Sequence, residues 1–166
     1  MKQRAQAVDA LAALFAFVGF TNSMNINSVN YALAYCVKDE KILLLYRSNT
    51  GYADGYYCLA GGKIEPHESA QQAIIREMNE ELGIIVKPQD TLLVHVMSYR
   101  GRAHGDHLNL VFAINEWEGT LNNNEPDKHG HFLWFSLSSL PENIIPLHKR
   151  MIDCIVQQQR YAQVGY

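Results

Sequence analysis

The segment from Gly62 to Ile84 constrains the fold of this chain more than any other part of the sequence. It reads GKIEPHESAQQAIIREMNEELGI and follows the pattern G-x5-E-x7-R-E-U-x-E-E-x-G-U, in which U is an apolar residue. At average residue frequencies, the probability that seven such specified positions match by chance in a chain of this length is on the order of one in a million. The spacing therefore indicates a functional constraint.

The second half of this segment predicts a helix from Ser69 to Leu82. These residues are good helix formers without Pro or Gly, and Gly83 stands where a glycine commonly ends a helix. One stripe of the helix is apolar and consists of Ile74, Ile75, Met78 and Leu82. A neighbouring stripe presents three carboxylates at i, i+3 and i+4, those of Glu77, Glu80 and Glu81.

An acidic stripe on a helix is usually a solvated face, because each like-charge pair costs only about 0.2–0.5 kcal/mol there. The preceding residues favour another interpretation. A Gly-Gly turn precedes Glu68, and Arg76 lies beside the carboxylates. Mg²⁺ binds carboxylate and carbonyl oxygens and readily shares substrate phosphates. A glycine loop that runs into an acidic helix supplies both kinds of oxygen, so the segment predicts a divalent metal site.

The segment resembles the signature of the Nudix hydrolases at every specified position. The resemblance implies a loop–helix–loop that binds Mg²⁺, with Mn²⁺ as a substitute, and a water that attacks a phosphorus of a nucleoside diphosphate linked to another group. It implies four metal ligands, the carbonyl of Gly61 and the carboxylates of Glu77, Glu80 and Glu81. Arg76, Glu77 and Glu80 are then expected to be catalytic, with Arg76 orienting the glutamates through ion pairs. Glu68 and Gly62 are expected to stabilise the loop.

Two residues outside the segment extend the resemblance to MutT-like members of the family. Arg47 follows an apolar run and is expected to contact substrate phosphate, the alternative being an ordinary strand-end arginine. Glu125, in WEGTLNNNEPDK, is expected to be a further metal ligand or base, with Asp127 or a solvated loop as alternatives. Ala60 stands where these relatives usually have the proline of Leu-Pro-Gly-Gly, which removes no ligand.

Other residues admit a second interpretation. His104 with His107, and His129 with His131, invite a transition-metal site. Neither pair has an accompanying cysteine or a helical H-E-x-x-H pattern, so surface or strand histidines are favoured. Trp134 alternates with polar neighbours and is expected in the core rather than as a base-stacking platform.

Composition and periodicity predict one domain. The 166 residues carry a formal net charge of −3, which argues against a nucleic-acid partner or an acidic membrane surface, and the three scattered cysteines favour a reducing cytoplasm. Strands are expected near 30–37, 41–47, 56–60, 91–99, 108–115 and 132–136, and helices at 69–82 and 147–162. This pattern predicts an α+β or α/β fold, which the resemblance narrows to a mixed β-sheet sandwiched between helices.

Residues 1–28 form an apolar N-terminal extension ahead of a single domain at 29–166. The apolar run from Ala10 to Phe20 is short for a membrane span and is followed by no clear signal-peptide cleavage site. We expect a helix that packs on the domain or on a partner subunit. In the second case the protein would be a homodimer. Met24 is an alternative start.

The leading hypothesis is hydrolysis of a nucleoside triphosphate, oxidised forms included, to the monophosphate and pyrophosphate. The alternative substrate is a nucleotide sugar or a dinucleoside polyphosphate. Tyr99 lies near the position of a tyrosine found in relatives that cleave dinucleoside polyphosphates, which supports the latter. ADP-ribose-cleaving relatives typically have a proline where this chain reads MSYRGR, and coenzyme A-cleaving relatives an arginine where it has Tyr52. A non-catalytic nucleotide-binding module is the third hypothesis, although such modules commonly lose the glutamates retained here.

Overall fold

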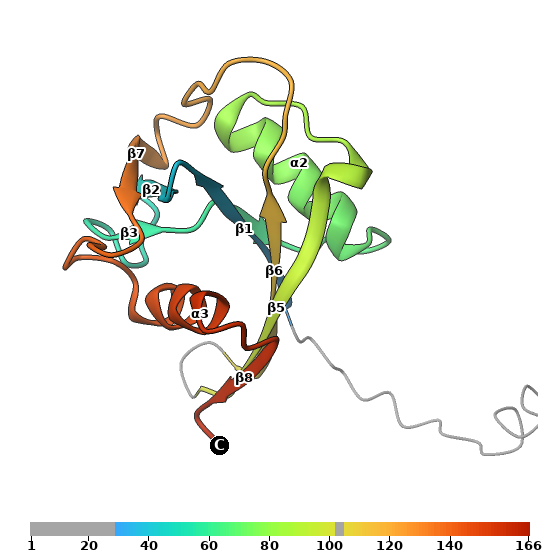
Figure 1. Cartoon of the computed structure of the whole chain (residues 1–166), viewed down its shortest axis with the longest axis vertical. Coiled ribbons are helices and arrows are strands. Elements are labelled where there is room, and N and C mark those ends of the chain that lie inside the picture. Colours follow the sequence, from blue (N-terminus) through green and yellow to red (C-terminus); the bar gives the residue numbers. More distant parts are fainter. Residues whose placement is uncertain (1–28, 102–104) are drawn as a thin grey trace, which may run out of the picture.

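In the computed structural model, which describes residues 29–101 and 105–166, eight strands form a mixed β-sheet with a helix on each face (Figure 1). The strands are β1 (Tyr31–Lys38), β2 (Lys41–Arg47), β3 (Tyr57–Cys58), β4 (Gly61–Lys63), β5 (Thr91–Tyr99), β6 (His107–Ile114), β7 (His129–Ser136) and β8 (Tyr161–Val164). The helices are α2 (Ala70–Leu82), α3 (Pro146–Val156) and the 3₁₀ helix η1 (Pro88–Asp90). The expected fold class is confirmed. The extension at 1–28 and His104 lie outside the described residues.

The strand order is β3-β2-β1-β6-β5-β8, with β4 paired to β1 and β7 paired to β2. The pairs β1–β6 and β5–β8 are parallel, and the other strand pairs are antiparallel. Strand β1 is central, because it pairs with β4 along one edge and with β6 along the other. In register, Tyr31 of β1 lies between Lys63 of β4 and Asn109 of β6.

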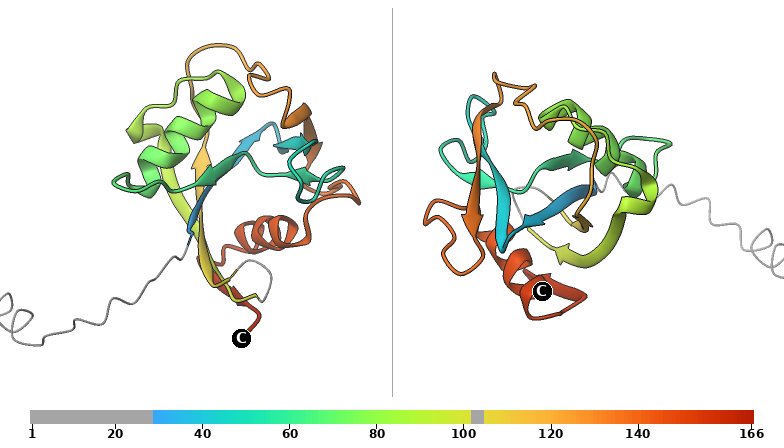
Figure 2. Two further views of the ribbon diagram at one scale, coloured as in Figure 1. Left: turned by 180° about the vertical axis from the view of Figure 1, so that it is seen from behind. Right: turned by 45° about the horizontal axis from the view of Figure 1, so that its top comes forward.

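Helices α2 and α3 lie on opposite faces of the sheet (Figure 2), and an apolar cluster holds each of them there. The cluster under α2 includes Ile74, Met78 and Leu82, so the predicted apolar stripe of this helix is confirmed. The cluster under α3 includes Met151 and Ile152. Burial of such side chains stabilises the fold by roughly 1.5–3 kcal/mol each, which fixes α2 and its carboxylates on the sheet.

Local signals set both ends of α2. The Ser69 hydroxyl accepts a hydrogen bond from the Gln72 backbone N–H, and the Gln72 side chain accepts one from the Ser69 N–H. Together they form a capping box, which satisfies two of the free N–H groups at the helix start. Gly83 ends the helix in the left-handed conformation, with φ of 67°, which favours glycine. The predicted helix at 69–82 is therefore confirmed.

The predicted helix at 147–162 is wrong at its C-terminal end. Helix α3 stops at Val156, whose side chain is 57% exposed, and Gln158 reverses the chain with a positive φ of 59°. Residues Tyr161–Val164 then form β8, which runs parallel to β5. The apolar helical spacing ends at Val156, and the glutamines that follow offer no face for the core to cover.

The region before α2 also differs from expectation. The strand expected at 56–60 is limited to Tyr57–Cys58, and the expected Gly-Gly turn is the short strand β4, which pairs with β1. At Gly61, with φ of 123°, a β-carbon would meet the backbone carbonyl of Ala32. Glycine is needed here because two strands approach too closely for a side chain. Trp134 packs half-buried against the α2 cluster, which confirms its expected place in the core.

The three cysteines, Cys36, Cys58 and Cys154, are buried and free, so no disulfide contributes to the fold. Burial raises the pKa of the Cys36 and Cys58 thiols to about 12. Within residues 29–101 and 105–166, no helix combines the length and apolar character that crossing a membrane requires.

Two substitutions on α3 test where its buried face ends. Met151→Ala removes a side chain that is 0% exposed and is expected to lower the free energy of unfolding by about 2–5 kcal/mol. Val156→Ala is the matched control on the same helix and is expected to change it by less than about 0.5 kcal/mol. Urea unfolding measures both. Equal losses would contradict the exposure of Val156.

Candidate active site

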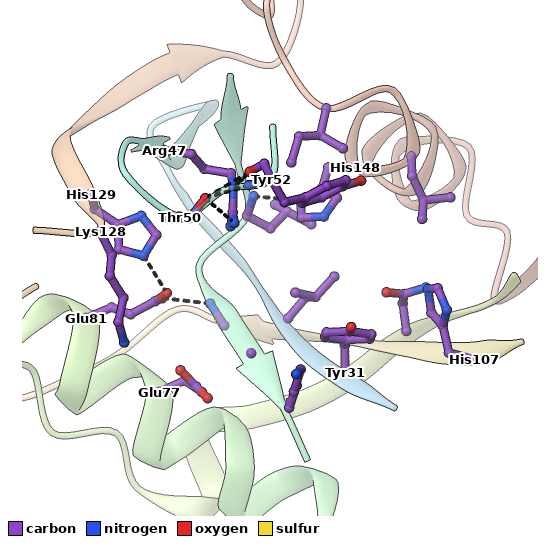
Figure 3. A pocket seen from close by; sticks show the side chains of 18 of the residues that line it. Tyr31, Arg47, Thr50, Tyr52, Glu77, Glu81, His107, Lys128, His129 and His148 are labelled. Atoms are coloured by element: carbon purple, nitrogen blue, oxygen red, sulfur yellow. Dashed lines mark hydrogen bonds and ion pairs between the residues drawn. The ribbon is translucent and has the colours of Figure 1, made fainter. Parts of the chain in front are cut away.

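A cavity of about 980 Å³ lies between α2, the sheet and the start of α3 (Figure 3). Carboxylates of α2 and of the loop before β7 line one end. Side chains of β1, β5 and β6 line the other end. Its size falls within the range of small-molecule sites, and it joins an ionic end to a largely uncharged one.

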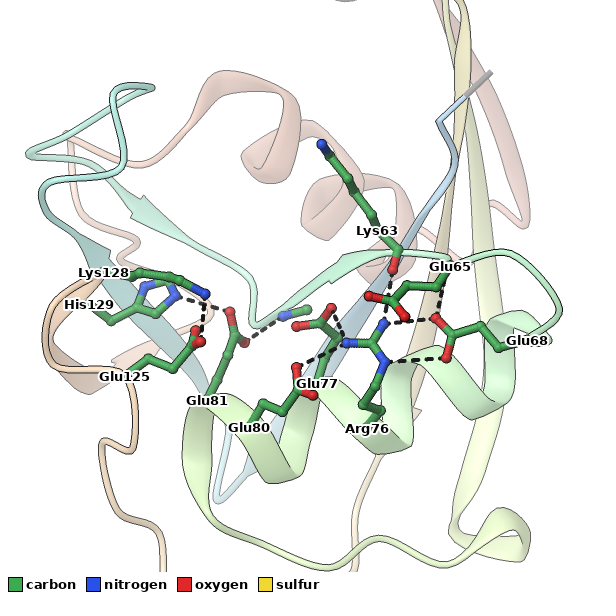
Figure 4. Close-up of polar contacts among 11 residues, drawn as sticks. Lys63, Glu65, Glu68, Arg76, Glu77, Glu80, Glu81, Glu125, Lys128 and His129 are labelled. Carbon is green, nitrogen blue, oxygen red and sulfur yellow. Dashed lines mark hydrogen bonds and ion pairs between the residues drawn. The ribbon is translucent and has the colours of Figure 1, made fainter. Parts of the chain in front are cut away.

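Arg76 is the centre of an ion-pair network at the acidic end (Figure 4). Its guanidinium donates to both carboxylate oxygens of Glu68 (Nη2–Oε1 2.8 Å, Nε–Oε2 3.2 Å). It also contacts Glu77 at 2.8 Å and Glu80 at 3.0 Å, and it donates to the carbonyl oxygen of Lys63 at 3.0 Å. Arg76 thereby ties the loop before α2 to two glutamates of the helix, in the geometry expected from the sequence.

Glu77 lies against the backbone of β4. A β-carbon at Gly62 would collide with the Glu77 carboxylate, so glycine at this position makes room for the charge. Burial raises the pKa of Glu77, and the nearby Glu81 and Glu80 charges add to the rise, while the Arg76 guanidinium opposes it. The site therefore concentrates negative charge at some cost, which a bound cation would offset.

Glu81 is the most enclosed carboxylate of the helix, with 5% of its surface exposed. One oxygen accepts a hydrogen bond from the Gly61 N–H at 2.7 Å, and the other lies 3.0 Å from Nε2 of His129. Burial raises the pKa of Glu81, while the contacts with His129 and Gly61 oppose the rise. Glu80, by contrast, has a side chain that is 51% exposed.

The loop before β7 brings Glu125 to the same place. Ligand-type atoms of Glu81, Glu125 and His129 all lie within 4.8 Å of one another. Lys128 reaches into this group and pairs with Glu125 at 2.6 Å. The carboxylates hold the pKa of the Lys128 ammonium above its usual value, with Glu125 the largest contributor. Asp127, the alternative to Glu125, does not join the group.

His129 is a site residue that sequence reasoning set aside. It is buried, and its Nδ1 has no hydrogen-bond partner among the described residues. The only local feature that points to a role for His129 is its position at the start of β7. There its backbone N–H donates a hydrogen bond to the Glu125 carbonyl. Its suggested partner His131 lies elsewhere, stacked on Tyr46 and 2.9 Å from the Tyr57 hydroxyl, so the two histidines do not act as a ligand pair.

Arg47 lines the cavity from the end of β2. Its Nε donates to the Tyr52 carbonyl at 2.9 Å and its Nη2 to the Thr50 hydroxyl at 2.8 Å, as Figure 3 shows. These contacts hold the guanidinium against the 48–56 loop.

His148 at the start of α3 also lines the cavity and was not anticipated from the sequence. Its Nδ1 accepts a hydrogen bond from the Leu59 N–H at 2.9 Å, which places the ring proton on Nε2. Burial lowers the pKa of His148 to about 3, and the charge of Arg47 adds to this shift. Only the folded chain brings these residues together, so no local sequence signal could have identified it.

The donor set fits a divalent cation. Carboxylates on α2 and Glu125 offer the oxygen ligands that hard cations prefer, and Gly62 leaves the space in which Glu77 sits. Burial is the main cause of the raised pKa values of Glu77 and Glu81, and neighbouring carboxylates add to the rise, so a cation bound between them would favour their charged forms.

Comparisons with known proteins agree with this geometry. The NUDIX domain profile matches residues 29–155, and the chain belongs to this family of hydrolases. It is 34% identical over 109 residues to the CTP pyrophosphohydrolase of Escherichia coli, covering 65% of this chain and 76% of that protein. It is also 34% identical over 105 residues to the ADP-ribose pyrophosphatase of Methanocaldococcus jannaschii, covering 63% of this chain and 60% of that protein.

A solved structure supports the same assignment. The MutT NUDIX hydrolase of Burkholderia pseudomallei superposes with a TM-score of 0.69 and 28% identity, covering 76% of this chain and 96% of that chain. The protein is therefore a Nudix pyrophosphohydrolase that acts on nucleotides, and enzymes of this family use divalent metals.

Gly62→Ala tests the close packing of the acidic end. The added β-carbon would displace the Glu77 carboxylate, so we expect Mn²⁺ affinity to fall by at least about tenfold, measured by titration calorimetry. Gly130→Ala is the matched control, because a β-carbon there makes ordinary contacts and neither glycine has a positive φ. An unchanged affinity in Gly62→Ala would show that metal binding does not depend on the Glu77 carboxylate lying beside residue 62.

The buried imidazole of His148 predicts a pH dependence of stability. Its pKa is about 3 in the folded protein against about 6.5 when unfolded, so the unfolded chain binds more protons between these values. The stability contribution is fully present above pH 6.5 and is lost as pH falls toward 3, by about 1.4 kcal/mol per pH unit.

His148→Asn keeps an acceptor for the Leu59 N–H and removes this titration. We expect the wild-type advantage over this variant, measured by urea unfolding, to shrink steadily below pH 6. His67→Asn serves as the matched control, because its side chain is exposed. Parallel pH profiles for wild type and His148→Asn would contradict the prediction.

Proposed function

We propose that this enzyme converts a nucleoside triphosphate, oxidised forms included, to the monophosphate and pyrophosphate. The observation that carries the proposal is the convergence of Glu77, Glu81 and Glu125 on one end of a cavity large enough for a nucleotide. Arg47 lines the same cavity and would contact the substrate phosphates. The likeness to a CTP pyrophosphohydrolase supports this class of substrate.

The proposed cofactor is Mg²⁺, with Mn²⁺ as a substitute, held by the Gly61 carbonyl and the carboxylates of Glu77, Glu80 and Glu81. When bound, such a cation polarises phosphoryl oxygens and lowers the pKa of a coordinated water. The Gly61 N–H already fixes one oxygen of Glu81, which would leave the other free to turn from His129 toward a cation.

The remaining roles follow from position. Arg76 would orient Glu77 and Glu80 through its ion pairs, while Glu68 anchors Arg76 to the loop. Glu125 approaches the cluster from a different element than the helix carboxylates, so we assign it to accept the proton of the attacking water or to complete the metal site. Lys128 would release Glu125 and counter the charge of a phosphate.

The second candidate is a nucleotide sugar such as ADP-ribose. The observation in its favour is the equal identity, 34%, to an ADP-ribose pyrophosphatase. The chain covers only 60% of that relative, and the sequence lacks the proline typical of that subclass downstream of Ile84. We therefore rank nucleoside triphosphates first.

Product analysis with Glu80→Gln tests the proposal. The wild type is expected to release pyrophosphate from a nucleoside triphosphate only with Mg²⁺ or Mn²⁺, and Glu80→Gln to lower kcat by at least about a hundredfold. Glu142→Gln, at an exposed position away from the cavity, is the matched control and is expected to retain full activity.

Two results would contradict the proposal. Equal rates for the wild type and Glu80→Gln would show that the metal site takes no part in the reaction. Release of monophosphates from ADP-ribose, with no turnover of any triphosphate, would select the second candidate.

A further inference from the structure

The end of the cavity remote from the carboxylates is chemically different from the acidic end. It is lined by Tyr31 of β1, Tyr99 of β5, His107 and Asn109 of β6, and Val164 of β8. None of these side chains is acidic. Arg47, the proposed phosphate contact, lies against the 48–56 loop (Figure 3), and Lys63 of β4 is the lateral neighbour of Tyr31. If phosphates occupy the acidic end, this end offers a place for the remainder of the substrate.

Aromatic rings form the wall of this end. The His107 ring lies 5.2 Å from that of Tyr31 in an edge arrangement and 4.7 Å from that of Tyr99 in a tilted one. The T-shaped and tilted contacts hold the rings in fixed positions and offer surface for a planar partner. Stacking on such rings accepts any nucleobase, so it supplies affinity without choosing among bases.

Asn109 is the polar side chain placed to discriminate among nucleobases. Its side chain is on the same face of the sheet as Tyr31, its lateral neighbour in register, and only 4% of the residue is exposed. Its Nδ2 donates to the Met97 carbonyl at 3.5 Å. Its Oδ1 accepts no hydrogen bond from any described residue, yet it is not among the atoms sealed from solvent. A nearly enclosed residue thus keeps one acceptor open to the cavity.

We propose that Asn109 determines base specificity, with its Oδ1 accepting a hydrogen bond from an exocyclic amino group of the nucleobase. This inference rests on the proposed function and names the substrate class within it, nucleotides with an amino-bearing base. An amino group satisfies the acceptor, whereas an oxo group in the same place would face it with a second acceptor and leave both unpaired. Sites of this kind discriminate strongly because the wrong substrate leaves a buried polar group without a partner.

Matched substrate pairs provide the test. CTP against UTP and ATP against ITP each exchange an amino for an oxo group, and GTP against ITP removes the 2-amino group. We expect kcat/KM of the wild type to favour the amino member of at least one pair by about tenfold or more. The pair with the largest ratio identifies the base.

Substitution at Asn109 assigns the preference to this side chain. Asn109→Leu keeps the shape and removes the acceptor, so the ratio is expected to fall to within about threefold of one. Asn109→Asp keeps an acceptor and is expected to retain the preference, and Asn115→Leu is the control at an exposed position just beyond β6. Thermal unfolding checks that each variant is folded, and Asn109→Ala replaces Asn109→Leu if the larger side chain prevents folding.

The outcomes separate this inference from the proposed function. Turnover with no preference in any pair, or a preference that survives in Asn109→Leu, overturns the role of Asn109 and leaves the hydrolase assignment intact. Absence of turnover for every nucleotide overturns the proposed substrate. In that event, titration calorimetry of CMP against UMP, AMP against IMP and GMP against IMP tests the site directly, and equal affinities within all three pairs overturn the inference.

Discussion

The ion pairs of Arg76 are the interaction on which the rest of the site depends. One guanidinium joins Glu68 in the loop, Glu77 and Glu80 on α2, and the Lys63 carbonyl of β4. Contacts to Glu68 and Glu77 hold the pKa of Arg76 above its already high ordinary value, so its charge is permanent. Without this cation, carboxylates that burial already disfavours would repel one another, and the loop would lose its attachment to the helix.

Much of this arrangement could be predicted because its signals are local. The capping residue Ser69, the apolar spacing and Gly83 define α2, and the helical period alone places Glu77 beside Glu81. Glu125 was found through resemblance, and the structure brings it to the cluster in place of Asp127.

The remaining features depend on contacts between distant segments. Strand β4 has three residues, two of them glycine, and so carries no alternating pattern, while β8 follows a run of glutamines that ends the helical period. His129, His148 and Asn109 acquire their importance from Glu81, Leu59 and Tyr31 respectively, which lie far away in the chain. No window of sequence contains both members of such a pair.

The pairing of β1 with both β4 and β6 has a consequence for substrate length. Lys63, Tyr31 and Asn109 are lateral neighbours across three hydrogen-bonded strands, and β4 leads directly through Gly61 to Glu81. The distance between the hydrolytic and aromatic ends is therefore set by strand spacing, which side-chain motion cannot alter. A molecule that reaches both ends of the cavity must therefore span a separation that the sheet itself fixes.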